Sequence, residues 1–343
     1  MTYPIFKGKG QTPIAKIKDI PKSQLSDLNN PRDYQCSDEL MHAVNVALIM
    51  NQPLLLTGEP GSGKTQLAHR VAWELELGPP LTFETKSNST AQDLFYTFNA
   101  LARFHAANRS DSIDVDDRDF ITYQALGEAI IQANTLENIK HILPSYGFVH
   151  KGPKRSVVLI DEIDKAPRDF PNDILNEIER MFFKIPQLDI KLNKKSDKLI
   201  EAPNDNQPIV IMTSNSEKQL PDAFLRRCVF HYIEFPDEKQ MDNILRLRLP
   251  GIAEQSSGFI KSAISLFFKL REKDNALLKK PSTGELIIWI NVMRRMAPEK
   301  QNPMETFGII FKSLGTLVKN NDDIKKAKEK IMEWMENQKI ESK

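Results

Sequence analysis

The sequence predicts an α/β fold with a central parallel sheet, followed by an all-helical C-terminal region. A glycine-rich loop at residues 58–65 stands between an apolar run and an amphipathic helical pattern. Two further apolar runs, at 156–160 and 208–213, have the unbroken hydrophobic character of strands that are buried on both faces. From Pro236 onward the strand pattern stops and amphipathic helices follow, which indicates a change from an α/β to a helical domain.

The glycine-rich loop matches the phosphate-binding pattern G-x-x-x-x-G-K-[ST] at every fixed position. Backbone N–H groups of such a loop cradle phosphate oxygens, and glycines allow the turn and the close approach. Lys64 would place its charge on the β- and γ-phosphates, and the Thr65 hydroxyl can bind Mg²⁺. A chance glycine-rich turn is the alternative, and the flanking strand and helix argue against it. The expected cofactor-binding residues are Gly58, Glu59, Pro60, Gly61, Ser62, Gly63, Lys64, Thr65 and Gln66.

Polar side chains follow two of the predicted core strands. Asp161 and Glu162 close the run at 156–160, and carboxylates at a strand end emerge where α/β proteins bind ligands. Asp161 is suited to holding Mg²⁺ through water, and Glu162 to polarising an attacking water. Asn215 follows the next strand and could hydrogen-bond the γ-phosphate or the water. Taken alone, the acidic pair is a common helix cap and Asn215 a turn residue; the phosphate-binding loop favours the functional interpretation for the acidic pair.

The expected elements follow from hydrophobic periodicity and flanking turn residues. Ser37 is an N-cap candidate for the first helix. The acidic segment 108–119 lacks calcium-loop spacing and is interpreted as a solvated insertion loop. Strands are expected at 53–57, 81–85, 156–160, 208–213 and 229–235. Helices are expected near 38–48, 65–77, 93–104, 124–133, 173–180, 220–228, 237–249, 258–272, 283–296, 303–318 and 322–338.

The bulk composition limits the class of protein. With 343 residues, 40% hydrophobic and 27% charged, the chain can bury a sizeable core. A net charge of +1 produces no global field toward nucleic acid or membranes, and no apolar run is long enough for membrane insertion. The two isolated cysteines and the absence of an apolar signal sequence predict a cytoplasmic location. The six histidines are scattered, so a structural zinc site is not expected.

The order and spacing of these motifs resemble an AAA+ ATPase, and more narrowly the MoxR branch of that superfamily. The narrower resemblance depends on residues 161–167, on the strand segments that flank 191–205, and on residues 220–223. It covers roughly residues 34–300. The resemblance implies a P-loop NTPase fold, a three-layer sandwich around the parallel sheet with an all-helical lid behind it.

The resemblance also implies roles for individual residues. Asp161 would be the metal-associated acid beside Thr65, and Glu162 the catalytic base. Asn215 would be the first sensor of the γ-phosphate. Arg227 is similar in position to an arginine finger that reaches a neighbouring subunit, with Arg226 as its neighbour or substitute.

Cofactors, partners and domains follow from the same resemblance. ATP and Mg²⁺ are the expected cofactors, and the expected assembly is a homo-oligomeric ring, usually a hexamer. Such rings remodel or activate a client protein, and MoxR-like members commonly work with a von Willebrand A domain protein. The expected domains are an N-terminal arm at 1–33, a nucleotide-binding domain at 34–235, and a lid domain with C-terminal helices at 236–343.

One departure from the family pattern concerns the second sensor, an arginine at the start of a lid helix. Gly284 stands where that arginine would fall. Either another cation substitutes or the coupling of the lid to nucleotide is altered. The neighbouring candidate cations are Lys279, Lys280, Arg294 and Arg295.

Three functions are compatible with these motifs: a remodeller of protein clients, a nucleic-acid motor, and a slow nucleotide-dependent switch or scaffold. The first is favoured, because no basic stripe with interleaved aromatic residues is visible. The segment 191–205 is expected to form a hairpin tip that faces the pore or client, or a tip whose lysines serve solubility only. Its lysines are Lys191, Lys194, Lys195 and Lys198.

Overall fold

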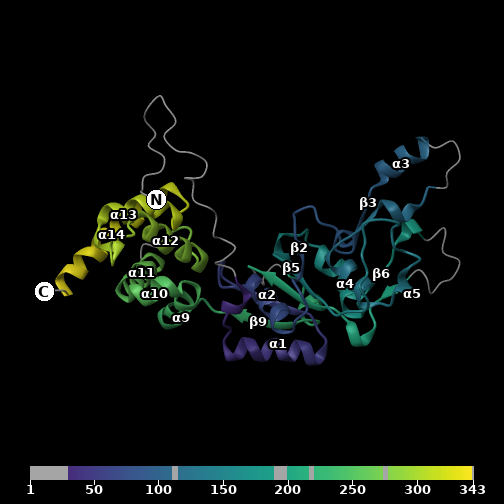
Figure 1. The fold of residues 1–343 in the computed structure, drawn as a ribbon, viewed down its shortest axis with the longest axis horizontal. Coiled ribbons are helices and arrows are strands. Elements are labelled where there is room, and N and C mark those ends of the chain that lie inside the picture. Colours follow the sequence, from purple (N-terminus) through teal and green to yellow (C-terminus); the bar gives the residue numbers. More distant parts are fainter. Residues whose placement is uncertain (1–29, 110–114, 189–198, 216–219, 273–276, 342–343) are drawn as a thin grey trace. The chain divides into compact units, whose positions relative to one another are not determined.

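The computed structural model divides the chain into two compact units. The α/β unit comprises Cys36–Glu59 and Gly63–Glu234, and the C-terminal unit comprises Phe235–Lys343 with two short stretches, one before Cys36 and one at Pro60–Ser62. Figure 1 shows the α/β unit in purple to green and the helices of the C-terminal unit in green to yellow. The residues described are 30–109, 115–188, 199–215, 220–272 and 277–341.

The α/β unit is built on a five-stranded parallel sheet with the strand order β2-β5-β8-β1-β9. Every residue of β1 and β8 is buried, as expected for central parallel strands covered on both faces. At one edge, β2 alternates between exposed and buried residues. The predicted parallel sheet is therefore confirmed. The strands are β1 Leu54–Gly58, β2 Leu81–Glu84, β5 Val157–Asp161, β8 Ile209–Ser214 and β9 Val229–Ile233.

Helices flank both sides of this sheet. Side chains of α4, α6 and α7 share one hydrophobic core with Val158, Ile160 and Met212 of the sheet. The first helix starts as predicted, because the Ser37 side chain accepts the N–H of Leu40 at 3.2 Å. The helices are α1 Asp38–Met50, α2 Lys64–Glu74, α4 Ala125–Ala133, α5 Leu136–Ile139, α6 Phe170–Asp173, α7 Leu175–Arg180 and α8 Asp222–Leu225.

The predicted helix at 93–104 is wrong over its first half. Instead, strand β3 (Tyr96–Phe98) pairs antiparallel with β4 (Ile121–Tyr123), and the helix α3 (Ala100–Arg109) stands between the two strands in sequence. Aromatic and β-branched residues of β3 gain cross-strand partners in β4, and these long-range pairs override the local helical periodicity. Figure 1 shows α3 extending beyond this pair of strands.

The acidic insertion is not a purely solvated loop. Asp117 is 8% exposed and forms an ion pair with Arg103 of α3 at 2.8 Å (Oδ1 to Nε). Residues 110–114 lie outside the described residues. A buried carboxylate that meets a guanidinium anchors the return of the chain from α3 to β4.

A second antiparallel pair joins β6 (Phe182–Phe183) to β7 (Ile200–Glu201). β6 lies in the strand segment predicted before the lysine-rich segment 191–205, whereas β7 lies inside that segment. The strand predicted after it is β8 of the central sheet. The four lysines themselves lie outside the described residues, so their expected exposure at a hairpin tip stays a prediction.

The C-terminal unit contains helices around a hydrophobic core of its own, in which Trp289 and Phe267 are fully buried. The predicted all-helical region is thus confirmed. The predicted helix at 303–318 is interrupted, because 3-10 turns at Pro303–Glu305 and Leu314–Thr316 flank α13. The helices are α9 Glu238–Arg248, α10 Pro250–Gln255, α11 Ser257–Arg271, α12 Thr283–Met296, α13 Phe307–Ser313 and α14 Asn321–Glu341. Among the described residues, no helix combines the length and the apolar character that crossing a membrane requires.

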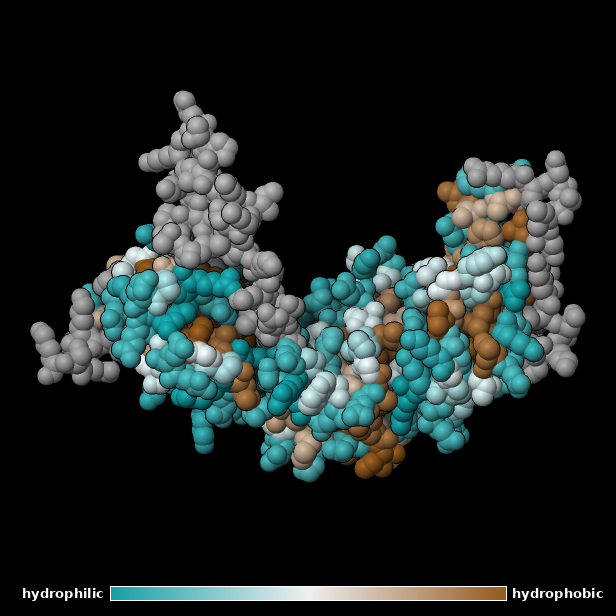
Figure 2. Space-filling model, in the orientation of Figure 1, coloured by the Kyte–Doolittle hydropathy of each residue, from teal (hydrophilic) through white to brown (hydrophobic). Residues whose placement is uncertain are grey.

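Two of the places on the α/β unit where apolar side chains are exposed lie on helices. One is the C-terminal end of α1, where Ile49 is 80% and Met50 59% exposed; the other is α3, where Leu101 is 66% and Phe104 60% exposed. Figure 2 shows hydrophobic residues in brown at both places. Contiguous exposed apolar side chains mark contact sites for other molecules more often than single ones do.

Candidate nucleotide-binding and hydrolysis site

The glycine-rich loop connects the buried strand β1 directly to the N-terminus of α2. Gly58, Gly61 and Gly63 have φ angles of 147°, 79° and 94°, which residues other than glycine rarely adopt. Gly63 forms the N-cap of α2 in the left-handed conformation. The first N–H groups of α2 therefore follow the loop directly, as in a strand–loop–helix anion site.

Lys64 lies inside the loop that precedes it. Its side chain is buried, and its ammonium group donates to the carbonyls of Gly58 at 2.8 Å and Glu59 at 3.0 Å. Burial lowers the pKa of Lys64, while nearby carboxylates, Asp164 first among them, act in the opposite direction. The geometry thus holds one positive charge at the point where phosphate oxygens would be bound.

Thr65 and Asp161 come together from two elements, the start of α2 and the end of β5. The Thr65 hydroxyl donates to Asp161 Oδ1 at 3.0 Å. Thr213, the penultimate residue of the neighbouring strand β8, donates from Oγ1 to the same carboxylate oxygen at 2.6 Å. Hydroxyl and carboxylate oxygens suit Mg²⁺, which usually takes one or two protein oxygens together with substrate phosphates. The part of the chain described here contains no cluster of three or more His, Cys, Asp or Glu residues able to hold a metal without a substrate.

Glu162 has the left-handed backbone conformation, with φ 54° and ψ 51°. A residue other than glycine adopts it only when the surroundings impose it, and such strain often occurs at functional sites. Here the Glu162 N–H donates to Thr213 Oγ1 at 2.8 Å, which fixes the turn at the end of β5.

The carboxylate of Glu162 is held from two sides. Lys165 forms an ion pair with Oε2, and this hydrogen bond is the main cause that raises the pKa of Lys165. The Asn215 side-chain amide lies 3.4 Å from Oε1, and the Asn215 N–H donates to Asp164 at 3.1 Å. The structure therefore brings Asn215 and Glu162 together at adjacent strand ends.

The two candidate arginines lie at the end of α8. Arg227 binds Glu179 of α7 at 2.8 Å (Nε to Oε2) and donates from Nη1 to the Ala223 carbonyl at 3.0 Å. Arg226 is the exposed C-cap residue of the same helix. In the contacts of the described residues, Arg227 therefore meets Glu179 and not the cluster around Glu162.

The sequence interpretation assigned no role to Thr213, Lys165 or Glu179. A signal existed for Thr213, because it ends a core strand that was expected beside the acidic strand. Lys165 belongs to the motif at 161–167, although no role was attached to it. No local pattern marks Glu179, since a glutamate on a short polar helix is ordinarily solvated.

Three buried polar atoms of the loop, α2 and the end of β2 have no hydrogen-bond partner among the described residues: Ser62 Oγ, Gln66 Oε1 and Thr85 Oγ1. Thr85 also donates its N–H to the Asp161 carbonyl at 3.2 Å, so its hydroxyl lies close to the acidic strand end. Buried polar atoms usually find a partner. The donor set and these unpartnered atoms fit a nucleoside triphosphate with Mg²⁺.

Comparison with known proteins identifies the family. A family model described as "AAA domain (dynein-related subfamily)" matches residues 53–228, just over half of the chain. The search among curated proteins gives no match. A structure of the RuvB Holliday junction branch migration motor from Thermotoga maritima is similar over 83% of this chain and 69% of its own, with 17% identity and a TM-score of 0.42. A single-residue variant of that RuvB matches over the same shares with 16% identity and a TM-score of 0.43.

Proposed function

Because this chain belongs to the AAA domain family (dynein-related subfamily), we propose that it hydrolyses ATP to ADP and phosphate and uses that energy to remodel or activate a client protein. The observation that carries the proposal is the hydrogen-bonded chain Thr65–Asp161–Thr213–Glu162 beside the lysine of the glycine-rich loop. It brings a phosphate-binding loop, oxygen donors for a metal and a held carboxylate to one edge of the sheet.

Each group has a separate task in the proposed reaction. Lys64 and the loop N–H groups bind the β- and γ-phosphates and compensate their charge. Thr65 and Asp161 would hold Mg²⁺, which would supply positive charge beside the phosphate oxygens. Glu162 orients and polarises the attacking water, and Asn215 holds the Glu162 carboxylate from the neighbouring strand.

We further propose that the protein acts as a homo-oligomeric ring, usually a hexamer in this superfamily, in which Arg227 serves the site of a neighbouring subunit. The position of Arg227 supports this assignment, since it is exposed at the end of α8, and among the described residues it contacts Glu179 and Ala223 rather than the cluster around Glu162 of its own chain. Arg226 is the candidate substitute. The proposed domains are the arm 1–33, the nucleotide-binding domain 34–235 and the helical lid 236–343.

The client class rests on surface chemistry. The exposed Leu101 and Phe104 of α3 offer apolar contacts for a polypeptide. The MoxR branch, with a von Willebrand A domain protein as partner, is the narrower proposal that follows from residues 161–167 and 220–223.

The test is an ATPase assay with two variants. Glu162→Gln keeps the shape of the side chain, so it should bind ATP and slow hydrolysis by orders of magnitude, whereas Lys64→Ala should weaken ATP binding. Lys328→Ala, which removes an exposed lysine of α14, is the matched control and should behave as the parent. Unchanged turnover in Glu162→Gln would contradict the assignment of the base.

The same assay separates the alternative functions. An unfolded client should stimulate hydrolysis by a remodeller. Stimulation by DNA or RNA instead would favour the nucleic-acid motor, and slow turnover that neither changes would favour a switch or scaffold.

A further inference from the structure

Strand β2 (Leu81–Glu84) is an edge strand whose outer side is unpaired by any described strand. It pairs with β5 alone and stands at the end of the strand order. Thr85 directs its N–H to Asp161 of β5. Hydrogen-bonding directions alternate along a strand, so Thr82 and Glu84 direct their backbone N–H and C=O groups to the outer edge.

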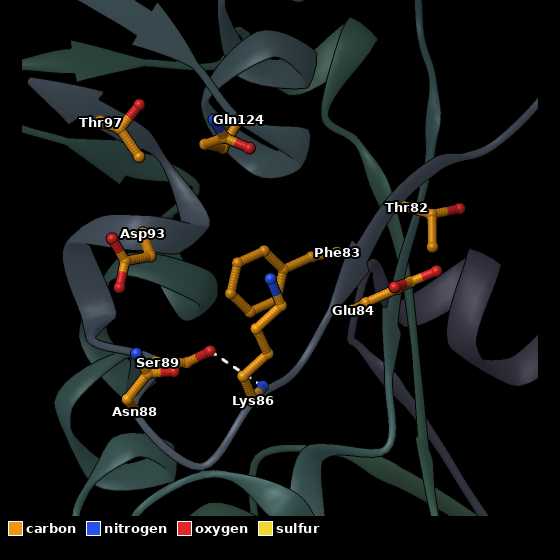
Figure 3. Close-up of a pocket in the computed structure, with 9 residues that line it drawn as sticks. All are labelled: Thr82, Phe83, Glu84, Lys86, Asn88, Ser89, Asp93, Thr97 and Gln124. Atoms are coloured by element: carbon orange, nitrogen blue, oxygen red, sulfur yellow. Dashed lines mark hydrogen bonds between the residues drawn. The ribbon is translucent and has the colours of Figure 1, made fainter. Parts of the chain in front are cut away.

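This edge opens onto a hollow of about 470 Å³. In Figure 3, Thr82 and Glu84 lie on one side of the hollow, and Asp93, Thr97 and Gln124 lie on the other, with Lys86 between them. The far side belongs to the turn after β2, to β3 and to the residue before α4. A groove therefore runs between the unpaired edge and the insertion that carries α3.

The turn that forms one end of the hollow is held by its own hydrogen bonds. Ser89 Oγ accepts the Lys86 N–H at 3.0 Å, and Asp93 Oδ2 accepts both the N–H and the hydroxyl of Thr90 at 2.8 Å. These bonds fix the turn that forms one wall of the hollow.

The lining selects a ligand with the chemistry of a polypeptide backbone. The edge offers alternating N–H donors and C=O acceptors, which a second main chain satisfies in register. Two carboxylates, Glu84 and Asp93, and one lysine, Lys86, line the hollow, so charge favours a cationic ligand only slightly and the main-chain groups of the edge decide binding. Polar side chains of Asn88, Thr97 and Gln124 add hydrogen-bonding groups that main-chain atoms can meet.

We propose that β2 accepts an extended segment of the client polypeptide as an added strand at the edge of the five-stranded sheet. The inference rests on the proposed function, because it names the part of a protein client that is bound and the place where it binds. β2 pairs with β5, and Thr85 after β2 donates its N–H to the Asp161 carbonyl. Only β2 would therefore separate a bound client strand from β5 and Asp161.

Amide hydrogen exchange tests the proposal in the unaltered sequence. The probe is a synthetic peptide of about eight alternating threonine and valine residues with one lysine near its centre. Its addition should slow exchange at the amides of Thr82 and Glu84 by about tenfold or more, and leave α14 unchanged. Protection of Thr82 and Glu84 that grows with protein concentration without peptide would show pairing between two copies, and would overturn the proposal.

A matched pair of variants tests the same edge. Thr82→Pro removes an outward N–H while the β2–β5 bonds remain, and should weaken peptide binding about tenfold or more, as measured by fluorescence anisotropy. Thr82→Val keeps the backbone and should bind as the parent does. Equal binding by both variants, with unchanged circular dichroism, would contradict strand addition.

The charge of Glu84 gives an independent measurement. A peptide with glutamate in place of the central lysine should bind two- to fivefold more weakly, roughly the size of a cross-strand charge pair, and Glu84→Lys should reverse this order. The anisotropy measurements are made in the Glu162→Gln background with ATP, where no turnover is needed. If the peptide does not bind while the Lys64 and Glu162 variants change ATP binding and hydrolysis as proposed, only this inference is overturned. If those two variants do not change ATP binding and hydrolysis as proposed, the proposed function is contradicted instead.

Discussion

The Thr213 hydroxyl donates to Asp161 Oδ1 at 2.6 Å and thereby joins the ends of the two central strands β8 and β5. The hydroxyl oxygen of Thr213 also accepts the N–H of Glu162 at 2.8 Å. Thr213 is 1% exposed, so neither bond is replaced by water when the hydroxyl is removed. One side chain thus positions both acidic residues of the site.

Thr213→Val should therefore impair hydrolysis more than nucleotide binding. The buried bonds are worth about 1–3 kcal/mol, so we expect kcat to fall by about ten- to a hundredfold. Thr213→Ser keeps the hydroxyl and should recover most of the rate. Steady-state kinetics with ATP and a separate nucleotide-affinity measurement check this, and a serine variant as slow as the valine variant would show that packing, not the hydroxyl, matters.

Arg227 should act on the nucleotide of a neighbouring subunit. A guanidinium aimed at the γ-phosphate can be worth about 10³–10⁵ in rate, so Arg227→Ala alone should be nearly inactive. Mixing Arg227→Ala with Glu162→Gln subunits should restore some ATPase activity, because some interfaces then pair an intact base with an intact arginine.

Arg226→Ala is the matched control for that experiment, since Arg226 is the exposed neighbour on the same helix end. It should keep most of the parent's activity. If Arg226→Ala is the inactive variant and Arg227→Ala is not, the two roles are exchanged. No recovery in proven mixed rings would contradict action in trans.

The sequence predicted those parts of the fold that depend on local pattern. Residue spacing and hydrophobicity predict the phosphate-binding loop, the buried strands around 158 and 211, and most of the helices. Strand β3 was missed because its pairing with β4 is separated by more than twenty residues of chain, and only the long-range partner outweighs the helical periodicity. The sequence thus predicts whether a segment is a helix or a strand where the contacts that decide it are made between residues close in sequence.

The site shows the same division. Lys64, Asp161 and Glu162 belong to motifs, so their residue types and positions are visible in the sequence. Thr213 and Glu179 matter through contacts across 52 and 48 positions of the chain, with Asp161 and Arg227 respectively. Such pairings depend on strand order and helix packing, which a single sequence does not display.

The two cysteine thiols should differ in reactivity. Burial raises the pKa of the Cys228 thiol to about 12, and its sulfur lies 3.3 Å from the Phe224 carbonyl. Cys36 is exposed. At about pH 8 the reactive thiolate of Cys228 is therefore rare, and iodoacetamide should label Cys36 at least about tenfold faster. Mass spectrometry of the digested protein measures both rates.

The Cys228 rate also reports on α8, which carries Phe224 and precedes Arg227 in the chain. Labelling of Cys228 should rise as pH approaches the raised pKa, because the thiolate fraction increases. Fast labelling of Cys228 at neutral pH in folded protein would contradict the packing of α8 described here.

The last prediction concerns Gly284, at the second position of α12. A second-sensor arginine would gain a bidentate contact with ATP that is lost after hydrolysis, and glycine cannot make it. The helix start is otherwise complete: the Ser282 and Glu285 side chains form a capping box. A Cβ added at 284 would meet nothing within 4 Å, so this position accepts a side chain.

The backbone before α12 is held by a buried acid. Asp323 is fully buried and accepts the N–H groups of Leu278 at 2.8 Å and Lys279 at 3.0 Å. These bonds fix the main chain just before Lys280. If Lys280 replaced the missing arginine, it would have to reach a phosphate by its side chain alone, without movement of the backbone. We therefore expect the lid to sense nucleotide through packing, and ATP and ADP to bind with similar affinity.

Both affinities are to be measured by calorimetry in Glu162→Gln, with and without Gly284→Arg. The arginine variant should gain a preference for ATP, since a charge-assisted hydrogen bond is worth about 1.5–3 kcal/mol, or roughly ten- to a hundredfold. Gly284→Ala is the control: it raises helix stability by up to about 1 kcal/mol without adding a charge, and should leave the affinity ratio unchanged. A strong ATP preference in the Gly284 form that Lys280→Ala abolishes would show that Lys280 compensates for the missing arginine, and the expectation of equal affinities would be wrong.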